Sequence, residues 1–134
     1  MKQLWLATCF VISAVGILHA QELTMEQPQG DVHPIQALRG KAPNERVRVY
    51  IVVNPVEAPG QYWVQDEAVL DGRGHWTCDA HFGEAIPAHD NKQFRVAAFA
   101  DRDLDLKPGL YDKNGWPRAR WHTDPIVVRR ASLR

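Results

Sequence analysis

Residues 46–53 read Arg-Val-Arg-Val-Tyr-Ile-Val-Val, and this stretch decides the fold class of the chain. Positions 47, 49, 51 and 53 are valine or isoleucine, whereas positions 46, 48 and 50 carry two arginines and a tyrosine. Successive side chains of a β-strand point to opposite faces, so this period of two predicts a strand with one apolar face. β-Branched residues also suit the pleated, half-buried surface of a sheet. The turn pair Asn54-Pro55 ends the strand.

The same alternation recurs on both sides of this strand. It predicts further strands at 61–70, 75–82, 93–100 and 126–129, and a weaker first strand at 32–38 that contains Pro34. Asp71-Gly72 supplies a hairpin turn, because glycine accepts the positive φ that a tight turn requires. No segment beyond residue 20 has a helical period. The pattern predicts an all-β fold, an antiparallel β-sandwich of about seven short strands.

The first twenty residues have the pattern of a secretory signal peptide. Lys2 gives a positive start, an apolar run follows from Leu4 to Leu18, and Ala20 precedes polar residues. The run is shorter than the roughly 20 apolar residues of a membrane span. We therefore expect cleavage after Ala20 and an exported protein, periplasmic or secreted, without a transmembrane span in the mature chain. An uncleaved segment that holds the protein to a membrane stays open as the alternative.

The remaining chain has room for one domain. Residues 21–31 are polar and are expected to form a flexible leader, residues 32–131 the β-domain, and residues 132–134 a tail. Loss of Lys2 leaves 15 basic residues against 16 acidic ones, so no basic excess points to nucleic acid. Loss of Cys9 leaves Cys78 alone, and a domain with one cysteine has no internal disulfide. Its stability must come from an apolar core.

The order of these features resembles that of short Ig-like or fibronectin-III-like domains of exported bacterial proteins. The resemblance covers about 32–130 and rests on the valine-rich strand before Asn54-Pro55, on Tyr62-Trp63-Val64-Gln65, on Gly74-His75-Trp76 and on the strand 94–98. The chain departs from antibody-type domains because it has no cysteine pair. The resemblance implies an Ig-like sandwich that serves as an interaction or spacer module. It carries no catalytic residues over to this chain.

The connection from Asp101 to Asp124 breaks the alternation and is long for a compact domain. Such a connection is typically functional or contains a further element. Its second half joins two tryptophans to planar hydrogen-bond donors, which suit a sugar ring or a protein partner. The alternative is that this segment folds back and buries the tryptophans. The candidate binding residues are Trp116, Arg118, Arg120, Trp121 and His122.

Three alternating carboxylates open the same connection. Asp101, Asp103 and Asp105 have the spacing of the first ligands of a calcium loop, but the glycine expected at the sixth position of an EF-hand is replaced by Leu106. A looser calcium site formed by the three aspartates is one hypothesis, and a solvated acidic loop is the other. No other cofactor is expected.

Candidate nucleophiles and metal ligands are few. Ser132 lies at the C-terminal end, where no rigid shell surrounds it, and Cys78 falls on the predicted core face of strand 75–82. We therefore predict a small exported, non-enzymatic binding module for an envelope or extracellular protein or a glycan; the oligomeric state stays open. One alternative is a carbohydrate-binding or calcium-dependent adhesive sandwich. The other is a metal-assisted enzyme, which requires His81, His89 and an aspartate to converge.

Overall fold

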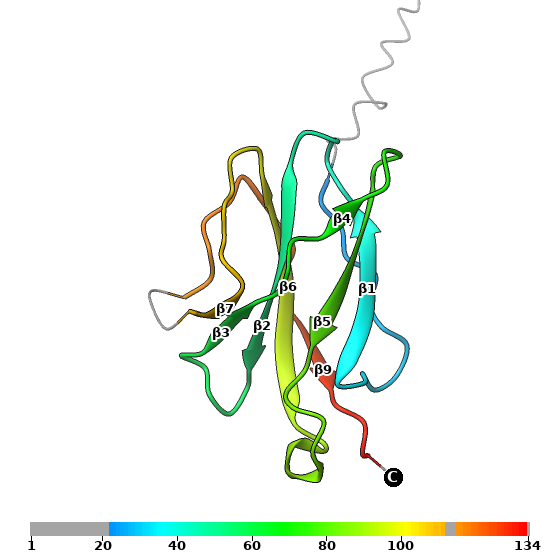
Figure 1. The fold of residues 1–134 in the computed structure, drawn as a ribbon, viewed down its shortest axis with the longest axis vertical. Coiled ribbons are helices and arrows are strands. Elements are labelled where there is room, and N and C mark those ends of the chain that lie inside the picture. Colours follow the sequence, from blue (N-terminus) through cyan, green and yellow to red (C-terminus); the bar gives the residue numbers. More distant parts are fainter. Residues whose placement is uncertain (1–21, 112–114, 134) are drawn as a thin grey trace, which may run out of the picture.

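The chain forms two antiparallel sheets in the computed structural model, which describes residues 22–111 and 115–133 (Figure 1). The predicted signal peptide at 1–20 lies outside these ranges. The smaller sheet has the order β1-β5-β4, formed by Ile35–Lys41, His75–His81 and Val69–Leu70. The larger sheet has the order β7-β3-β2-β6, formed by Gly109–Tyr111, Tyr62–Val64, Arg48–Pro55 and Gln93–Asp101. Two short strands, β8 (Trp121–His122) and β9 (Ile126–Arg129), pair with successive parts of β6.

The all-β prediction is confirmed, and the only helical element of the described ranges is the 3-10 turn η2 (Pro87–His89). The described residues form nine strands in place of about seven, for two reasons. The predicted strand 61–70 is two strands, because the chain crosses from the larger sheet at Val64 to the smaller sheet at Val69. The connection 101–124 also contains β7 and β8, which its weak alternation did not reveal.

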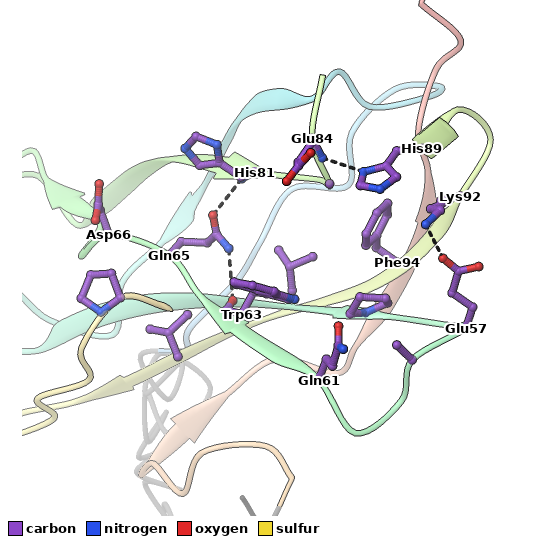
Figure 2. A pocket seen from close by; sticks show the side chains of 16 residues that line it. Glu57, Gln61, Trp63, Gln65, Asp66, His81, Glu84, His89, Lys92 and Phe94 are labelled. Carbon is purple, nitrogen blue, oxygen red and sulfur yellow. Dashed lines mark hydrogen bonds and ion pairs between the residues drawn. The ribbon is translucent and has the colours of Figure 1, made fainter. Parts of the chain in front are cut away.

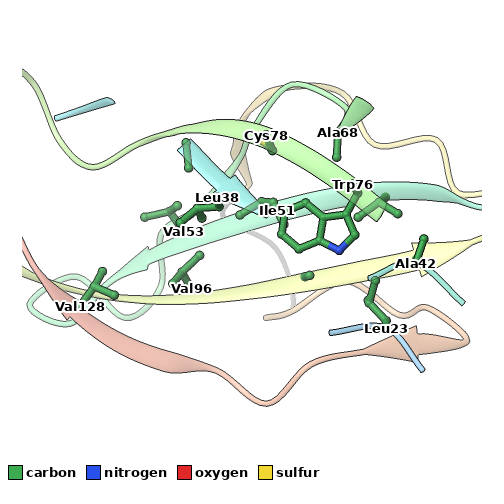
Figure 3. Packing of buried hydrophobic residues seen from close by; sticks show 14 of the residues in the cluster. Leu23, Leu38, Ala42, Ile51, Val53, Ala68, Trp76, Cys78, Val96 and Val128 are labelled. Atoms are coloured by element: carbon green, nitrogen blue, oxygen red, sulfur yellow. The ribbon is translucent and has the colours of Figure 1, made fainter. Parts of the chain in front are cut away.

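The main core lies between the two sheets (Figure 3). From β2 it takes the predicted apolar face, Val49, Ile51 and Val53, each at most 1 % exposed. β5 contributes Trp76, which is fully buried and donates its indole N–H to the carbonyl of Thr24 over 2.9 Å. These side chains come from strands of both sheets, so burying them holds the sheets together. The rest of the predicted face of 75–82 is buried as well: Cys78, Ala80 and Phe82.

A second apolar cluster lies on the opposite face of the larger sheet. Tyr50 and Val52 of β2 pack there with Phe99 of β6, and each of the three is at most 4 % exposed. Leu104, Leu106, Trp116 and Ala119 of the connection after β6 pack against this cluster. β2 is therefore buried on both faces, which explains why apolar residues also occupy its second face.

Residues 22–26 lie along β1, although the sequence predicts a flexible leader at 21–31. The backbone N–H of Thr24 donates to the carbonyl of Lys41 over 2.9 Å, and that of Glu26 donates to Arg39 over 2.8 Å. Leu23 is 7 % exposed and belongs to the main core. At Gly40 a Cβ atom would lie 1.8 Å from the carbonyl oxygen of Thr24, so only glycine permits this close crossing. These two backbone hydrogen bonds attach the segment to the β1 edge of the smaller sheet.

Candidate functional site

The two sheets differ in width, and the difference leaves part of the larger sheet uncovered. In Figure 1, β3 and β7 lie to the left, away from β1 and β5 of the smaller sheet. Trp63 pairs with Val53 on one side and with Leu110 on the other, and side chains of directly paired residues share a face of the sheet. Val53 is buried in the core, whereas Trp63 is 41 % and Leu110 48 % exposed. The face that forms the core under β5 therefore continues as an open apolar strip on β3 and β7.

A pocket of about 510 Å³ lies where this open strip meets the end of β5. We call it the Trp63 pocket. The larger sheet lines it with Trp63, Pro55 and Phe94. His81, the last residue of β5, lines it from the smaller sheet (Figure 2). Its volume falls in the range of small-molecule sites, which combine an apolar lining with a few placed polar groups.

Gln65 fixes the inner end of the pocket. Its side chain is 6 % exposed, its Oε1 accepts a hydrogen bond from the backbone N–H of His81 over 2.8 Å, and its Nε2 donates to the carbonyl of Trp63 over 3.1 Å (Figure 2). These bonds join the end of β5 to the end of β3. The amide therefore holds the crossover between the two sheets in place beside Trp63.

Arg130 holds the loop that forms one wall of the pocket. The side chain is fully buried. Its Nη1 donates to the carbonyls of Phe82 (3.3 Å) and Glu84, and its Nη2 donates to the carbonyl of Ile86 (2.7 Å) and to Oδ1 of Asp90 (3.1 Å). A buried guanidinium needs such partners to offset its lost hydration. These bonds hold the loop 82–90 around the side chain of Arg130.

Gly83 and His89 form the rim that this loop presents. The backbone N–H of Glu84 donates to Nδ1 of His89 over 2.8 Å (Figure 2). Gly83 has φ of 71°, and a Cβ atom there would lie 2.8 Å from Nδ1 of His89. Both the left-handed backbone and the contact with the imidazole therefore require glycine.

The charged groups that line the pocket are mainly carboxylates. Glu57 pairs with Lys92 at 2.6 Å, which neutralises both (Figure 2). Asp66 and Glu84 also line the pocket, are exposed, and have no ion pair among the described residues. With neutral imidazoles, the lining carries a net charge of about −2.

The five predicted binding residues do not form one surface. Trp116 stacks on Phe99, with ring centroids 5.8 Å apart, and His122 stacks on the same ring at 6.5 Å. Trp121 lies on the other face of the sheet, because it pairs with Ala100 of the main core, and the Arg120 guanidinium lies 4.4 Å from its ring centroid. Arg118 is exposed. The packing of Trp116 agrees with the alternative in which the segment folds back.

The three aspartates of the calcium hypothesis bind groups of the protein or face solvent. The Asp101 carboxylate accepts the backbone N–H groups of Arg102 (2.7 Å) and Arg120 (3.0 Å). Asp105 lies 3.5 Å from a guanidinium nitrogen of Arg48, and Asp103 is exposed. His81 and His89 do line one pocket with Asp66. In the described part of the chain, however, no three histidine, cysteine or acidic side chains are placed to hold one metal ion.

Cys78 lies in the main core under the smaller sheet. Burial raises the pKa of its thiol to about 12, and the nearby carboxylates of Asp79 and Asp66 add to the rise. A thiol with this pKa stays protonated near neutral pH and is a poor nucleophile. The geometry supports the structural role that its strand face predicts.

Comparisons with known proteins leave the site to be interpreted from its own chemistry. No protein-family model, no curated protein and no solved structure matches this chain significantly. Between residues 22 and 133, apart from 112–114, no helix is long and apolar enough to cross a membrane.

Proposed function

We propose that this protein is an exported, non-enzymatic binding domain of the Ig-like type, and that its ligand occupies the Trp63 pocket. The observation that carries the proposal is the half-exposed indole of Trp63 inside a pocket of about 510 Å³, beside polar groups that the fold holds in place. Large aromatic side chains left open in a concave, polar-rimmed site are typical of ligand recognition. The location differs from the loop surface that the sequence predicts.

The strand order supports the Ig-like type. β1, β5 and β4 follow one another across one sheet, with residues 22–26 hydrogen-bonded to the free edge of β1, and β9, β6, β2 and β3 follow one another across the other. This is the order of the A-B-E-D and G-F-C-C′ strands of an immunoglobulin sandwich. On this alignment β7 and β8 belong to the connection between strands F and G. Export is supported by the predicted signal peptide at 1–20.

A non-enzymatic role is supported by what the pocket brings together. His81, His89, Asp66 and Glu84 line it, but no hydroxyl or thiol nucleophile stands among its lining residues. Cys78 is in the core with a raised pKa. Binding in place of catalysis is the simplest function for such a lining.

The test is a titration followed by NMR with four small probes: n-pentylammonium, n-pentanol, hexanoate and methyl glucoside. We expect at least one to cause saturable shifts of the Trp63 indole and of backbone amides within 81–89, and Trp63→Ala to abolish the shifts of these amides. Trp116→Phe is the matched control, since Trp116 lies on the other face of the sheet. If none of the four probes shifts these signals at 20 mM or below, and neither of the two peptides described in the next subsection binds, the proposal fails.

A further inference from the structure

The chemistry of the Trp63 pocket indicates the charge of its ligand, and this inference rests on the function proposed above. The single lysine of the lining is neutralised by Glu57, at 2.6 Å. Asp66 and Glu84 are left to set the potential inside the pocket. A cleft lined by one sign of charge concentrates ligands of the opposite sign. The lining therefore favours a cation and disfavours a carboxylate or phosphate.

The aromatic group at the centre of the pocket fits the same ligand. Figure 2 shows Trp63 on β3, across from the loop that carries Glu84 and His89. Tryptophan is the best partner for a cation above an aromatic ring, and it also packs against the aliphatic carbons that carry the charge. Pro55 and Phe94 add apolar surface for such a stem. An ammonium or guanidinium on an aliphatic stem satisfies both parts of the lining.

Exposed apolar surface continues beyond the pocket along β3 and β7. Leu110 lies next to Trp63 on the same face of the sheet and is 48 % exposed. A free amine inside the pocket leaves this leucine uncovered, whereas a chain that continues along β3 and β7 covers it. Contiguous exposed apolar side chains beside a polar rim are typical of protein interaction sites. The occupant is therefore better matched by a polypeptide than by an isolated small molecule.

We propose that the Trp63 pocket receives a lysine or arginine side chain of a partner protein, with Asp66 and Glu84 facing the cation, Trp63 packed against its stem, and Leu110 covered by an apolar neighbour of that side chain. The partner is thus a basic segment with an adjacent apolar residue.

The test uses the blocked peptide acetyl-Gly-Leu-Lys-Leu-Gly-amide and the same peptide with norleucine in place of lysine. Norleucine keeps all four carbons of the stem and removes the charged ammonium group. We expect the lysine peptide to bind at least tenfold more tightly, and its affinity to fall about tenfold in the double variant Asp66→Asn/Glu84→Gln. Higher ionic strength weakens the binding, because these carboxylates are exposed. Asp79→Asn, an exposed position elsewhere on the smaller sheet, is expected to leave the affinity unchanged.

Each outcome decides one part of the inference. Equal binding of the lysine and norleucine peptides, or an unchanged affinity in the double variant, overturns the cation preference. Binding of n-pentylammonium as tight as that of the lysine peptide overturns the assignment to a partner protein, since a free amine then suffices. The failure of all four small probes and of both peptides refutes the proposed function itself, whereas tight binding of hexanoate or methyl glucoside refutes only this inference.

Discussion

Trp116 and Trp63 lie on opposite faces of the larger sheet, and they differ in what covers them. Trp116 comes from the connection 101–124, packs on Phe99 at 5.8 Å and meets Tyr62 edge-on at 5.1 Å. Trp63 comes from a strand and yet is 41 % exposed, because the smaller sheet stops short of β3. Trp116, although it comes from a long loop, is packed against other aromatic rings. Trp63, although it comes from a strand, is exposed. The surroundings of each residue, more than its element, indicate which one is available to a ligand.

The largest expected effect on stability comes from Arg130, which holds the loop that forms one wall of the Trp63 pocket. Arg130→Met removes a buried guanidinium that binds the carbonyls of Phe82, Glu84 and Ile86 and the Asp90 carboxylate. We expect the free energy of unfolding to fall by about 3–5 kcal/mol, since breaking a buried pair leaves its partners unsatisfied. Urea denaturation measures the loss. Arg130→Lys, which keeps the charge without the planar fork, is expected to recover part of it. A loss below about 1 kcal/mol would show that the wall does not depend on Arg130.

The two tryptophans give the direct comparison. Trp116→Ala is expected to lower the free energy of unfolding by about 2–3 kcal/mol, because it opens a space against Phe99 and Tyr62. Trp63→Ala is expected to cost less than about 1 kcal/mol and to remove binding in the pocket. Thermal and urea unfolding of both variants measure the difference. Equal losses of stability would contradict the view that one side chain is structural and the other is kept for a ligand.

The smallest expected effect concerns Cys78, which lies in the main core between the two sheets. Burial raises the pKa of its thiol from the ordinary 9.0 to about 12. Between these values the unfolded chain releases a proton that the folded protein retains, so the free energy of unfolding falls as the pH rises. At pH 10 the loss attributable to this group is about 1.4 kcal/mol, and by about pH 8 it is negligible. Urea unfolding at pH 8 and pH 10 measures the difference, and Cys78→Ala should show a smaller one. The same pH dependence in both proteins would place its origin elsewhere.

The sequence predicts much of the fold because the period-two pattern is local. Residues 75–82 and 93–100 alternate regularly, and their predicted apolar faces are buried in the structure. The final strand 126–129 has the bounds that the structure gives. The crossover at 65–68 was missed, because an alternating run carries no information about which sheet a residue joins. The pairing of 22–26 with β1 was also missed, although polar and apolar residues alternate from Glu22 to Glu26. A run this short does not indicate which strand its backbone contacts.

The candidate site was predicted less well, because a pocket depends on how the sheets overlap. Trp63 and Gln65 share one face of the predicted strand 61–70, and an aromatic beside a polar residue on a core face is the one local signal of an opening. The loop surface at 116–122 attracted attention through its composition alone. Composition does not reveal that Phe99 lies beneath Trp116, nor that Trp121 faces the other side of the sheet. The role of the five residues there in binding stays a prediction.

The contacts of Arg130 have a consequence for variation of the pocket. Three of its four acceptors are main-chain carbonyls, which every amino acid possesses. Substitutions at Glu84, Ala85 or Ile86 therefore leave the anchoring bonds available while they change the chemical groups that the loop displays. The side chains that the loop presents to a ligand can therefore change while its backbone stays in place. This makes the loop a suitable place to redesign the specificity of the domain.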